Sequence, residues 1–538
     1  MTYTAPVAEQ RFVLDHVADL DVEPDMLDAV LDGAASLAEG EWAPLATKGD
    51  TVGAKWTPDG VVMPEGYREA YQAFVEGGWG TIGVPEEHGG QGLPFVVAAA
   101  VLETLGSANM GFALAPILSV GAIEALAHHG TPEQQATYLP KLATGEWTGT
   151  MNLTEPQAGS DVGALRATAT PRGDGTFSIK GTKIYISFGD HDLADNIIHL
   201  VLARTPDAPA GTRGISLFLV PKIRLDGTPN DVRVVSIEHK MGLHASPTCV
   251  LSFGDHDDCV GELIGPEFGG MRAMFTMMNN ARLNVGLQGV QVAEAATQKA
   301  VDYAKERVQG AREGQPTAIL GHPDVRRMLM RMKAQTQAAR ALVYYACAQV
   351  GREGSGDRLE ILTPLAKAHA TDIGNEVASL GIQVHGGMGY VEETGAARFF
   401  RDARITPIYE GTNGIQAADL VGRKLSLSNG AAFAGLIADL KSAEHPRLAA
   451  LVEACETVGR RLQTADADDR LAASYPFLTM LSTATCGWLM ERLAREGNDT
   501  RKAVAAFYLD QIVPEAHGLE AAASAPASQL YALGVDDF

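Results

Sequence analysis

The stretch ALRATATPRGDGTFSIKGTKIYISFG, residues 164–189, decides the fold class because its residues alternate with the period of a β-strand. Gly173-Asp174-Gly175 supplies a tight turn between two such runs. Further short strand candidates follow along the chain, namely IIHLVLAR (197–204), GISLFLVPK (214–222) and TCVLSFGD (248–255). Residues 147–261 are therefore predicted to form a small antiparallel β domain.

Long runs with helical spacing lie on both sides of this region. FVVAAAVLETLGSANMGFALAPILSVGAIEALAHHG (95–130) precedes it, and LNVGLQGVQVAEAATQKAVDYAKERV (283–308) and DVRRMLMRMKAQTQAARALVYYACAQV (324–350) follow it. The predicted fold is mainly α-helical with one small central antiparallel β domain. The expected parts are an N-terminal extension (1–40), an N-terminal helical domain (41–146), the middle β domain (147–261), a helical domain of four-helix-bundle type (262–430) and an additional C-terminal helical domain (431–538), with SLSNG (426–430) as a linker.

The composition is that of a water-soluble globular protein, with 46% hydrophobic and 20% charged residues among 538. The formal net charge of −23 repels nucleic acid and anionic membranes, so a polyphosphate ligand needs a local cluster of Arg and Lys. The five cysteines are widely spaced and show no metal-ligand pattern. The chain starts without a basic region followed by an apolar run, and no uninterrupted apolar stretch of about 18 residues occurs. We expect a cytoplasmic protein without membrane insertion, nucleic-acid binding or a metal site.

Two segments near the start of the β domain carry hydroxyl and aromatic side chains suited to a cofactor. In MNLTEPQAGSDVGALRA (151–167), Thr154 and Ser160 offer hydroxyls beside free backbone N–H groups. In GTKIYISFGDHD (181–192), strand alternation places Tyr185 and Ser187 on one face. An ordinary capped turn and a half-buried strand are the alternatives for these two segments.

A glycine-rich segment, GIQVHGGMGY (381–390), interrupts the second helical region and is predicted to be a loop. Gly386, Gly387 and Gly389 would let the backbone approach phosphate oxygens closely. The segment does not match the dinucleotide-binding fingerprint, in which the glycines follow a strand and open a helix. A tight turn between two helices is the alternative interpretation.

The segment RDARITPIYEGTNGIQAADLVGRKL (401–425) contains the candidate base. Glu410 follows the apolar pair Ile408-Tyr409 and precedes Gly411-Thr412, so it lies where an apolar segment meets a turn. A carboxylate in that position has a raised pKa and can act as a general base. A capping or salt-bridging role is the alternative.

Together these segments resemble a known family. TEPQAGSD, IYISFG, QVHGGMG and IYEGTNGIQ, with the loop VPEEHGGQGL and the α–β–α order, resemble the signatures of the acyl-CoA dehydrogenases over about residues 40–430. The N-terminal extension and the C-terminal helical domain resemble the longer bacterial members, which act on fatty acyl-CoAs or on 3-(methylthio)propanoyl-CoA. KMGLHASPTCVLSF and YAKERVQG resemble that subgroup in particular.

The resemblance implies a flavin enzyme that holds FAD noncovalently and uses Glu410 to take the α proton of an acyl-CoA while the flavin accepts the β hydride. The implied FAD contacts are Leu153, Thr154, Ser160, Tyr185, Ser187, Arg307, Gln309, Gln383, Gly387 and Thr412. Of these, Arg307, Gln309, Gln383 and Gly387 match positions that reach the FAD of the neighbouring subunit. The implied substrate contacts are Ser160, Arg282 and Gly411.

Three positions bear on this assignment. Some family members carry the base just before the residue that is Arg282 here, but that position is Ala281, which leaves Glu410 as the base. Gly310-Ala311 stands where many relatives have Phe-Gly, and Gly414 where many have Gln, so the FAD contacts there depart from the family pattern.

The resemblance also implies partners and leaves alternatives. We expect a homodimer that oxidises fatty acyl-CoA in β-oxidation and passes electrons to an electron-transferring flavoprotein. The alternatives are a 3-(methylthio)propanoyl-CoA dehydrogenase, an acyl-CoA oxidase that uses O₂, and a non-enzymatic flavin-binding relative that binds DNA. The last needs a basic C-terminal domain, and residues 431–538 contain no basic cluster. No single residue indicates the acyl chain length.

Overall fold

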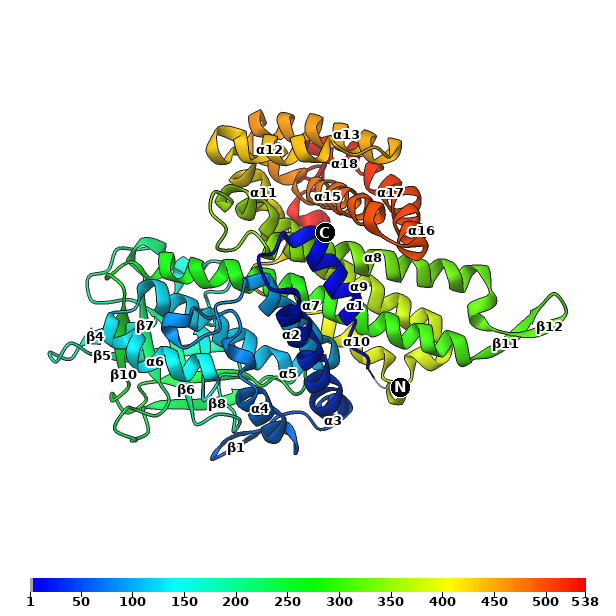
Figure 1. Cartoon of the computed structure of the whole chain (residues 1–538). Helices are drawn as coiled ribbons and strands as arrows, with labels where there is room; N and C mark the ends of the chain where they lie inside the picture. Colours follow the sequence, from blue (N-terminus) through cyan, green and yellow to red (C-terminus); the bar gives the residue numbers. More distant parts are fainter. Residues whose placement is uncertain (1–2) are drawn as a thin grey trace.

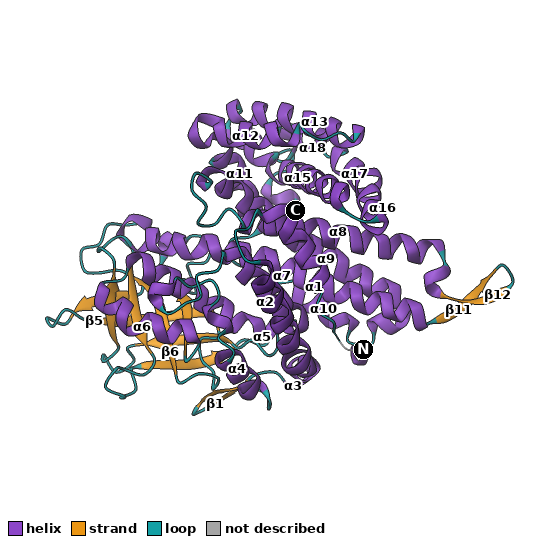
Figure 2. Ribbon diagram, viewed as in Figure 1, coloured by secondary structure: helices purple, strands orange, loops and turns teal. Residues whose placement is uncertain are grey.

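The computed structural model of the chain describes residues 3–538, apart from the side chains at positions 276, 277 and 279. Figure 1 shows a β domain at one side, a central bundle of long helices, and the C-terminal helices above the bundle. Figure 2 shows that the strands gather almost entirely in that one domain, while helices make up the rest. The predicted fold class, mainly helical with a small central β domain and an extra C-terminal helical region, is confirmed.

The N-terminal region is helical and surrounds one long apolar helix. Its helices are α1 (Val7–Val13), α2 (Pro24–Leu37), α3 (Ala46–Val52), α4 (Tyr67–Glu76), α5 (Phe95–His129) and α6 (Pro132–Thr144). Helix α5 kinks at Asn109, whose backbone angles are not helical. By length and composition α5 could cross a membrane, but 78% of its most apolar window is buried inside the protein, as in the core helix of a globular protein.

The β domain contains eight strands: β3 (Trp147–Asn152), β4 (Thr168–Pro171), β5 (Phe177–Ser187), β6 (Asn196–Ala203), β7 (Ser216–Pro221), β8 (Val232–Ile237), β9 (Thr248–Phe253) and β10 (Val260–Ile264). Their order is β3-β6-β7-β10-β5-β9-β8, with β4 paired to β5. The predicted hairpin around Gly173-Asp174-Gly175 is confirmed, since β4 and β5 pair antiparallel on either side of it. The prediction of a purely antiparallel domain needs one correction, because β3 and β6 pair in parallel.

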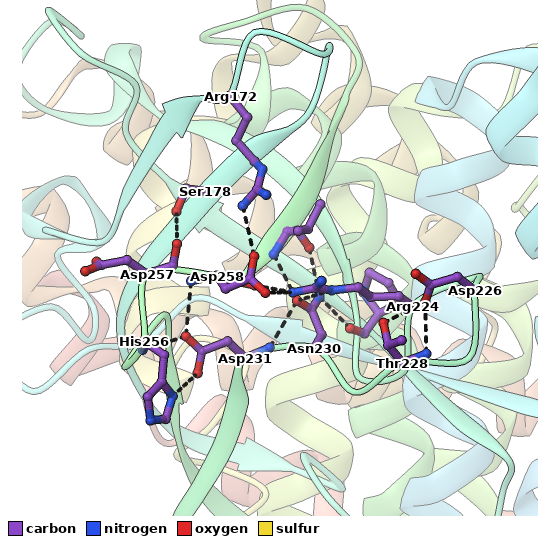
Figure 3. Close-up of polar contacts among 12 residues, drawn as sticks. Arg172, Ser178, Arg224, Asp226, Thr228, Asn230, Asp231, His256, Asp257 and Asp258 are labelled. Carbon is purple, nitrogen blue, oxygen red and sulfur yellow. Dashed lines mark hydrogen bonds and ion pairs between the residues drawn. The ribbon is translucent and has the colours of Figure 1, made fainter.

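One end of the β domain is held by a dense polar network (Figure 3). The carboxylate of Asp231 accepts hydrogen bonds from the backbone N–H of His256 at 2.7 Å and from its ring Nδ1 at 3.1 Å. The guanidinium of Arg224 binds the carboxylate of Asp258 at 2.7 Å. These contacts fix the loop between β9 and β10 against the chain that leads into β8.

The central bundle consists of α7 (Gly270–Glu306), α8 (Pro323–Cys347) and α9 (Gly356–His385), with the shorter α10 (Ala396–Ala403) and α11 (Asn413–Gly422) packed on it. Helices α7 and α9 approach so closely that a Cβ on Gly289 would lie 2.1 Å from the carbonyl oxygen of Ala370, so glycine is required there. A hairpin of β11 (Val308–Arg312) and β12 (Gln315–Ala318) projects away from the end of α7 (Figure 1).

The C-terminal helices are α12 (Ala431–Leu440), α13 (Pro446–Thr464), α14 (Ala467–Ala472), α15 (Ser474–Glu496), α16 (Asp499–Phe507), α17 (Val513–His517) and α18 (Glu520–Ser524). The predicted linker contains Ser428, Asn429 and Gly430 in left-handed conformations, which end one helical segment and start the next. Buried residues of α8, α9 and α15 belong to one continuous apolar core, so this region packs directly onto the bundle.

Candidate active site

Glu410 lies in a strained turn between α10 and α11. Its φ is +55°, and that of Gly411 is +82°, so two successive residues adopt the left-handed conformation. For a residue with a side chain this costs of order 1–3 kcal/mol and persists only where the surroundings enforce it. Thr412 then caps α11, because its Oγ1 accepts a hydrogen bond from the N–H of Ile415 at 3.1 Å. The turn presents the half-buried carboxylate of Glu410 between α7, α9 and α11.

The surroundings of Glu410 act on its pKa in opposite directions. Burial raises the pKa of Glu410, while the positive charges of Arg282 and Lys367 oppose that rise. Arg282 is itself only 7% exposed, and its Nη2 lies 3.9 Å from where a Cβ on Gly411 would be. The direction of the Glu410 shift agrees with the prediction from the apolar segment before it.

The loop after β3 is fastened to β5 by a buried ion pair that the sequence reasoning missed. Lys183 and Glu155 are 0% and 4% exposed, and Lys183 Nζ lies 2.8 Å from the Glu155 carboxylate. Lys183 also donates to the carbonyl oxygen of Leu153 at 3.0 Å, and Ile184 N–H donates to the carbonyl oxygen of Thr154 at 2.9 Å. The sequence did contain a signal for this pair. Lys183 is an even number of residues from the buried Ile179, so both side chains point to the inner face of β5.

The predicted alternation along this strand is interrupted. The register of β5 against β9 shifts between Lys183 and Ile186, and Tyr185 has a φ of +60° within this bulge. Tyr185 is therefore 61% exposed, Ile186 is buried and Ser187 is half-buried, while Ile184 is not fully buried as simple alternation predicts. The bulge aims the Tyr185 ring outward beside the loop of Thr154.

A second group of predicted residues gathers at the other end of the bundle. Arg307 ends α7, and its Nη2 lies 3.3 Å from Oε1 of Gln309 on the projecting hairpin. Tyr303 stacks on His385 with ring centroids 4.3 Å apart, which joins this end of α7 to the end of α9. Gln383 lies on the last turn of α9, and Gly386–Tyr390 continue as a short 3₁₀ helix. The prediction of a glycine-rich loop at 381–390 is therefore wrong, because this segment is helical.

The two groups are far apart within one chain. Lys367, which contacts the Glu410 turn, and Gln383 are separated along α9 by a length of roughly 24 Å at the helical rise. Leu153, Thr154 and the exposed Ser160 lie in the loop after β3, which is hydrogen-bonded through Thr154 to β5 beside Tyr185. A single extended ligand cannot be held by both groups of one chain unless it spans that distance.

Comparison with known proteins identifies the arrangement. Family models describe four successive parts: acyl-CoA dehydrogenase N-terminal domain (25–146), middle domain (150–256) and C-terminal domain (269–425), then acetyl-CoA dehydrogenase C-terminal like (418–534). The 3-methylmercaptopropionyl-CoA dehydrogenase of Ruegeria pomeroyi is 45% identical over 535 residues, covering 91% of this chain and 90% of that protein. The chain belongs to the acyl-CoA dehydrogenase family. It is an FAD-dependent oxidoreductase.

A further relative and a solved structure match most of this acyl-CoA dehydrogenase. A butyryl-CoA dehydrogenase of Syntrophomonas wolfei is 37% identical over 555 residues, covering 92% of this chain and 90% of that protein. The crystal structure of an acyl-CoA dehydrogenase from Bacillus anthracis, complexed with FAD, has a TM-score of 0.77 at 22% identity and covers 97% of this chain and 93% of that one. The latter likeness establishes the fold.

The residues of this acyl-CoA dehydrogenase fit FAD. A Cβ placed on Gly386 or Gly387 would meet no atom within 4 Å, so open space lies against the backbone where phosphate oxygens can approach. Arg307 is exposed next to that end of the bundle, and the Tyr185 ring is exposed at the other group. Among the residues that the structure describes, no group of three or more His, Cys, Asp or Glu could hold a metal ion.

Proposed function

We propose that this acyl-CoA dehydrogenase oxidises a short acyl-CoA thioester to the trans-2-enoyl-CoA, with 3-(methylthio)propanoyl-CoA as the first candidate. The similarity to the Ruegeria pomeroyi enzyme carries this choice, because it covers 91% of the chain at 45% identity and so includes the C-terminal domain. Butyryl-CoA, a substrate of fatty acyl β-oxidation, is the second candidate, supported by the 37% identity to the Syntrophomonas wolfei enzyme. Both substrates carry a short unbranched chain.

Glu410 acts as the base that removes the α proton. The turn holds the Glu410 carboxylate against α7. Because its pKa is raised, the proton affinity of this carboxylate is closer to that of the α carbon of a polarised thioester. The backbone N–H of Glu410 has no acceptor among the described residues, so it can donate to the thioester carbonyl oxygen and stabilise the negative charge that develops there. FAD, when bound, supplies the acceptor for the hydride that leaves the β carbon. Arg282 and Gly411 contribute the wall of the same site.

The two groups of flavin residues act on different FAD molecules in a homodimer. Leu153, Thr154, Ser160, Tyr185, Ser187 and Thr412 would surround the flavin ring of their own subunit. Arg307, Gln309, Gln383 and Gly387 would hold the pyrophosphate of the FAD bound to the other subunit. The separation of the two groups along α9, together with the exposed Arg307 and open glycines, supports this division. Ser160 and Arg282 would also contact the acyl-CoA.

The electron acceptor in this proposal is an electron-transferring flavoprotein in the cytoplasm. An oxidase that uses O₂ is the competing possibility, and the two differ in whether aerobic enzyme makes peroxide without an added acceptor. Exclusion of water from the site favours the protein acceptor.

The substrate proposal is tested by anaerobic flavin bleaching with a panel of acyl-CoAs. The panel contains 3-(methylthio)propanoyl-CoA, butyryl-CoA and unbranched acyl-CoAs of up to sixteen carbons. We expect the fastest bleaching with the first compound and a product lighter by two hydrogens. Faster bleaching by a long-chain acyl-CoA than by either short compound would contradict the proposal.

A further inference from the structure

Lys367 is a fully buried cation beside the Glu410 turn that the proposed mechanism does not yet use. It lies on α9 at 0% exposure, and its Nζ donates to the carbonyl oxygen of Gly411 at 2.9 Å and to Oδ1 of Asn413 at 2.8 Å. Both of these acceptors are neutral oxygens. A buried charge satisfied only by neutral oxygens is expensive to maintain, which points to a specific role.

A chain of hydrogen bonds continues from Lys367 to the C-terminal domain. The amide Nδ2 of Asn413 donates to Oδ1 of Asp372 at 2.9 Å, and Tyr475 on α15 donates its hydroxyl proton to Oδ2 of Asp372 at 2.6 Å. Asp372 lies about one and a half helical turns beyond Lys367 on α9. The C-terminal domain therefore reaches the residue directly after the candidate base through side chains alone.

We propose that Lys367, Asn413 and Asp372 form a positioning relay through which Tyr475 of the C-terminal domain holds the Glu410 turn, and that the Lys367 ammonium places a buried positive charge beside that turn. This inference rests on the proposed role of Glu410 as the base. The left-handed conformations of Glu410 and Gly411 need an external restraint, and the hydrogen bond from Lys367 to the Gly411 carbonyl supplies it. Lys367 is thus a positioning residue, since it touches the turn rather than the reacting atoms.

The charges around Glu410 define the sign of the electrostatic effect. The charges that act on Glu410 are Arg282 on α7 and Lys367 on α9. Lys367 is also acted on by Asp372, and Arg282 by Asp419 of α11, Arg423 and Glu360. Burial lowers the pKa of Lys367 to about 8, against the opposing pull of Glu410 and Asp372, so the ammonium is still mostly charged at neutral pH. Removal of that charge leaves the effect of burial on the Glu410 pKa less opposed, so Glu410 becomes protonated at a higher pH.

The first experiment measures the rate of anaerobic flavin reduction against pH for Lys367→Met and Lys367→Arg. We expect the acid limb of the Lys367→Met profile to move to higher pH, while Lys367→Arg keeps the wild-type limb because it keeps the charge. A purely structural role would lower the rate equally at every pH. If Lys367→Met has full FAD content and the acid limb of its pH–rate profile coincides with that of the wild type, the electrostatic part of the proposal is overturned.

The second experiment tests the link to the C-terminal domain without removing a buried residue. Tyr475→Phe should slow flavin reduction about three- to tenfold, with FAD content and substrate affinity unchanged, and should add little in a Lys367→Met background. Tyr345→Phe is the matched control, because its hydroxyl accepts a hydrogen bond at 3.1 Å from Arg358, which plays no part in the relay. A wild-type rate for Tyr475→Phe, or full additivity with Lys367→Met, would overturn the relay.

These outcomes are separate from a failure of the proposed function. If no acyl-CoA bleaches the wild-type flavin, the proposed function fails before any variant is compared. If the wild type is active and Glu410→Gln is not, the relay alone is judged by the Lys367 and Tyr475 variants.

Discussion

The Lys183 ammonium and the Glu155 carboxylate form an ion pair at 2.8 Å in which both side chains are almost fully buried. Burial alone would raise the pKa of Glu155, yet Lys183 and the backbone N–H groups of Arg166 and Ala167 hold that pKa below its ordinary value. The carboxylate thus accepts hydrogen bonds from one ammonium, two backbone amides and the side-chain amide of Gln157. The pair joins the loop that carries Thr154 to the strand that carries Tyr185, so it fixes the surface on which the flavin ring is proposed to lie.

Lys183→Met should destabilise the protein and weaken FAD binding together. Loss of the ammonium leaves Glu155 as a buried charge without its partner, which typically costs about 3–5 kcal/mol. Urea unfolding measures the free energy, and the absorbance of bound flavin measures FAD content. Lys180→Met is the matched control on the same strand, because Lys180 pairs with Asp257 at the surface, where ion pairs contribute little to stability. Equal losses in the two variants would contradict this account.

Arg307→Ala should loosen FAD and the dimer together. Arg307 is exposed at the end of α7, and in the proposed homodimer it would bind the FAD of the neighbouring subunit. Flavin content after gel filtration and the mass from light scattering report the two effects. Lys305→Ala removes an exposed cation from the same helix end and should change neither. Normal flavin content in a stable monomer of the Arg307→Ala protein would defeat the shared-site proposal.

Asn230→Asp should unfold the β domain more readily while the catalytic site is unchanged (Figure 3). The Asn230 amide Nδ2 donates to the carbonyl oxygens of Pro221 and Val260, both at 2.9 Å. A carboxylate oxygen in that place would face two acceptors, so we expect a loss of about 3 kcal/mol or more in the free energy of unfolding. Asn498→Asp is the control, because Asn498 caps α16 as an acceptor and Asp caps equally well. The melting temperatures of the two variants decide the comparison.

The sequence predicted the fold class because helical and strand periods change sharply near residues 147 and 262. It did not predict the parallel pairing of β3 with β6, since every residue of β6 is buried and a continuous apolar run does not indicate its neighbours. It placed Gln383 in a loop because glycines follow it, whereas packing of His385 on Tyr303 maintains the helix to its end. Tertiary contacts outweighed local composition there.

Only those features of the candidate site that depend on neighbouring residues in the sequence could be predicted. The apolar residues before Glu410 were enough to predict its raised pKa. Lys367 is 44 positions away from Gly411 along the chain, and Lys183 is 28 positions from Glu155, so neither partnership leaves a local pattern. One signal could have indicated both lysines: a charged residue at an inward-facing position of a strand, as at Lys183, or within an apolar stretch of a helix, as at Lys367.

Glu410→Gln tests the chemistry and the stability of the site at once. Gln keeps the shape and removes the basicity, so FAD and acyl-CoA should still bind while flavin reduction slows by at least about 10²–10⁴-fold. Glu410→Asp retracts the carboxylate by about 1 Å and should fall between the wild type and Gln, because such a displacement can cost about 10²-fold. Anaerobic bleaching with a good acyl-CoA measures all three rates. Bleaching of the Gln variant at the wild-type rate would place the base elsewhere.

The raised pKa of Glu410 also sets the pH dependence of both rate and stability. The base must be ionised, so the wild-type rate should fall as pH drops through a value above the ordinary range of a glutamate. Between the unfolded and folded pKa values the folded protein binds more protons than the unfolded one, so this group lowers the stability as pH rises through that window. Glu410→Gln lacks this cost and should be more stable than the wild type at neutral pH, with the difference shrinking below the ordinary glutamate pKa. Denaturant unfolding at several pH values checks it, and a constant difference across that range would show that the carboxylate does not titrate there.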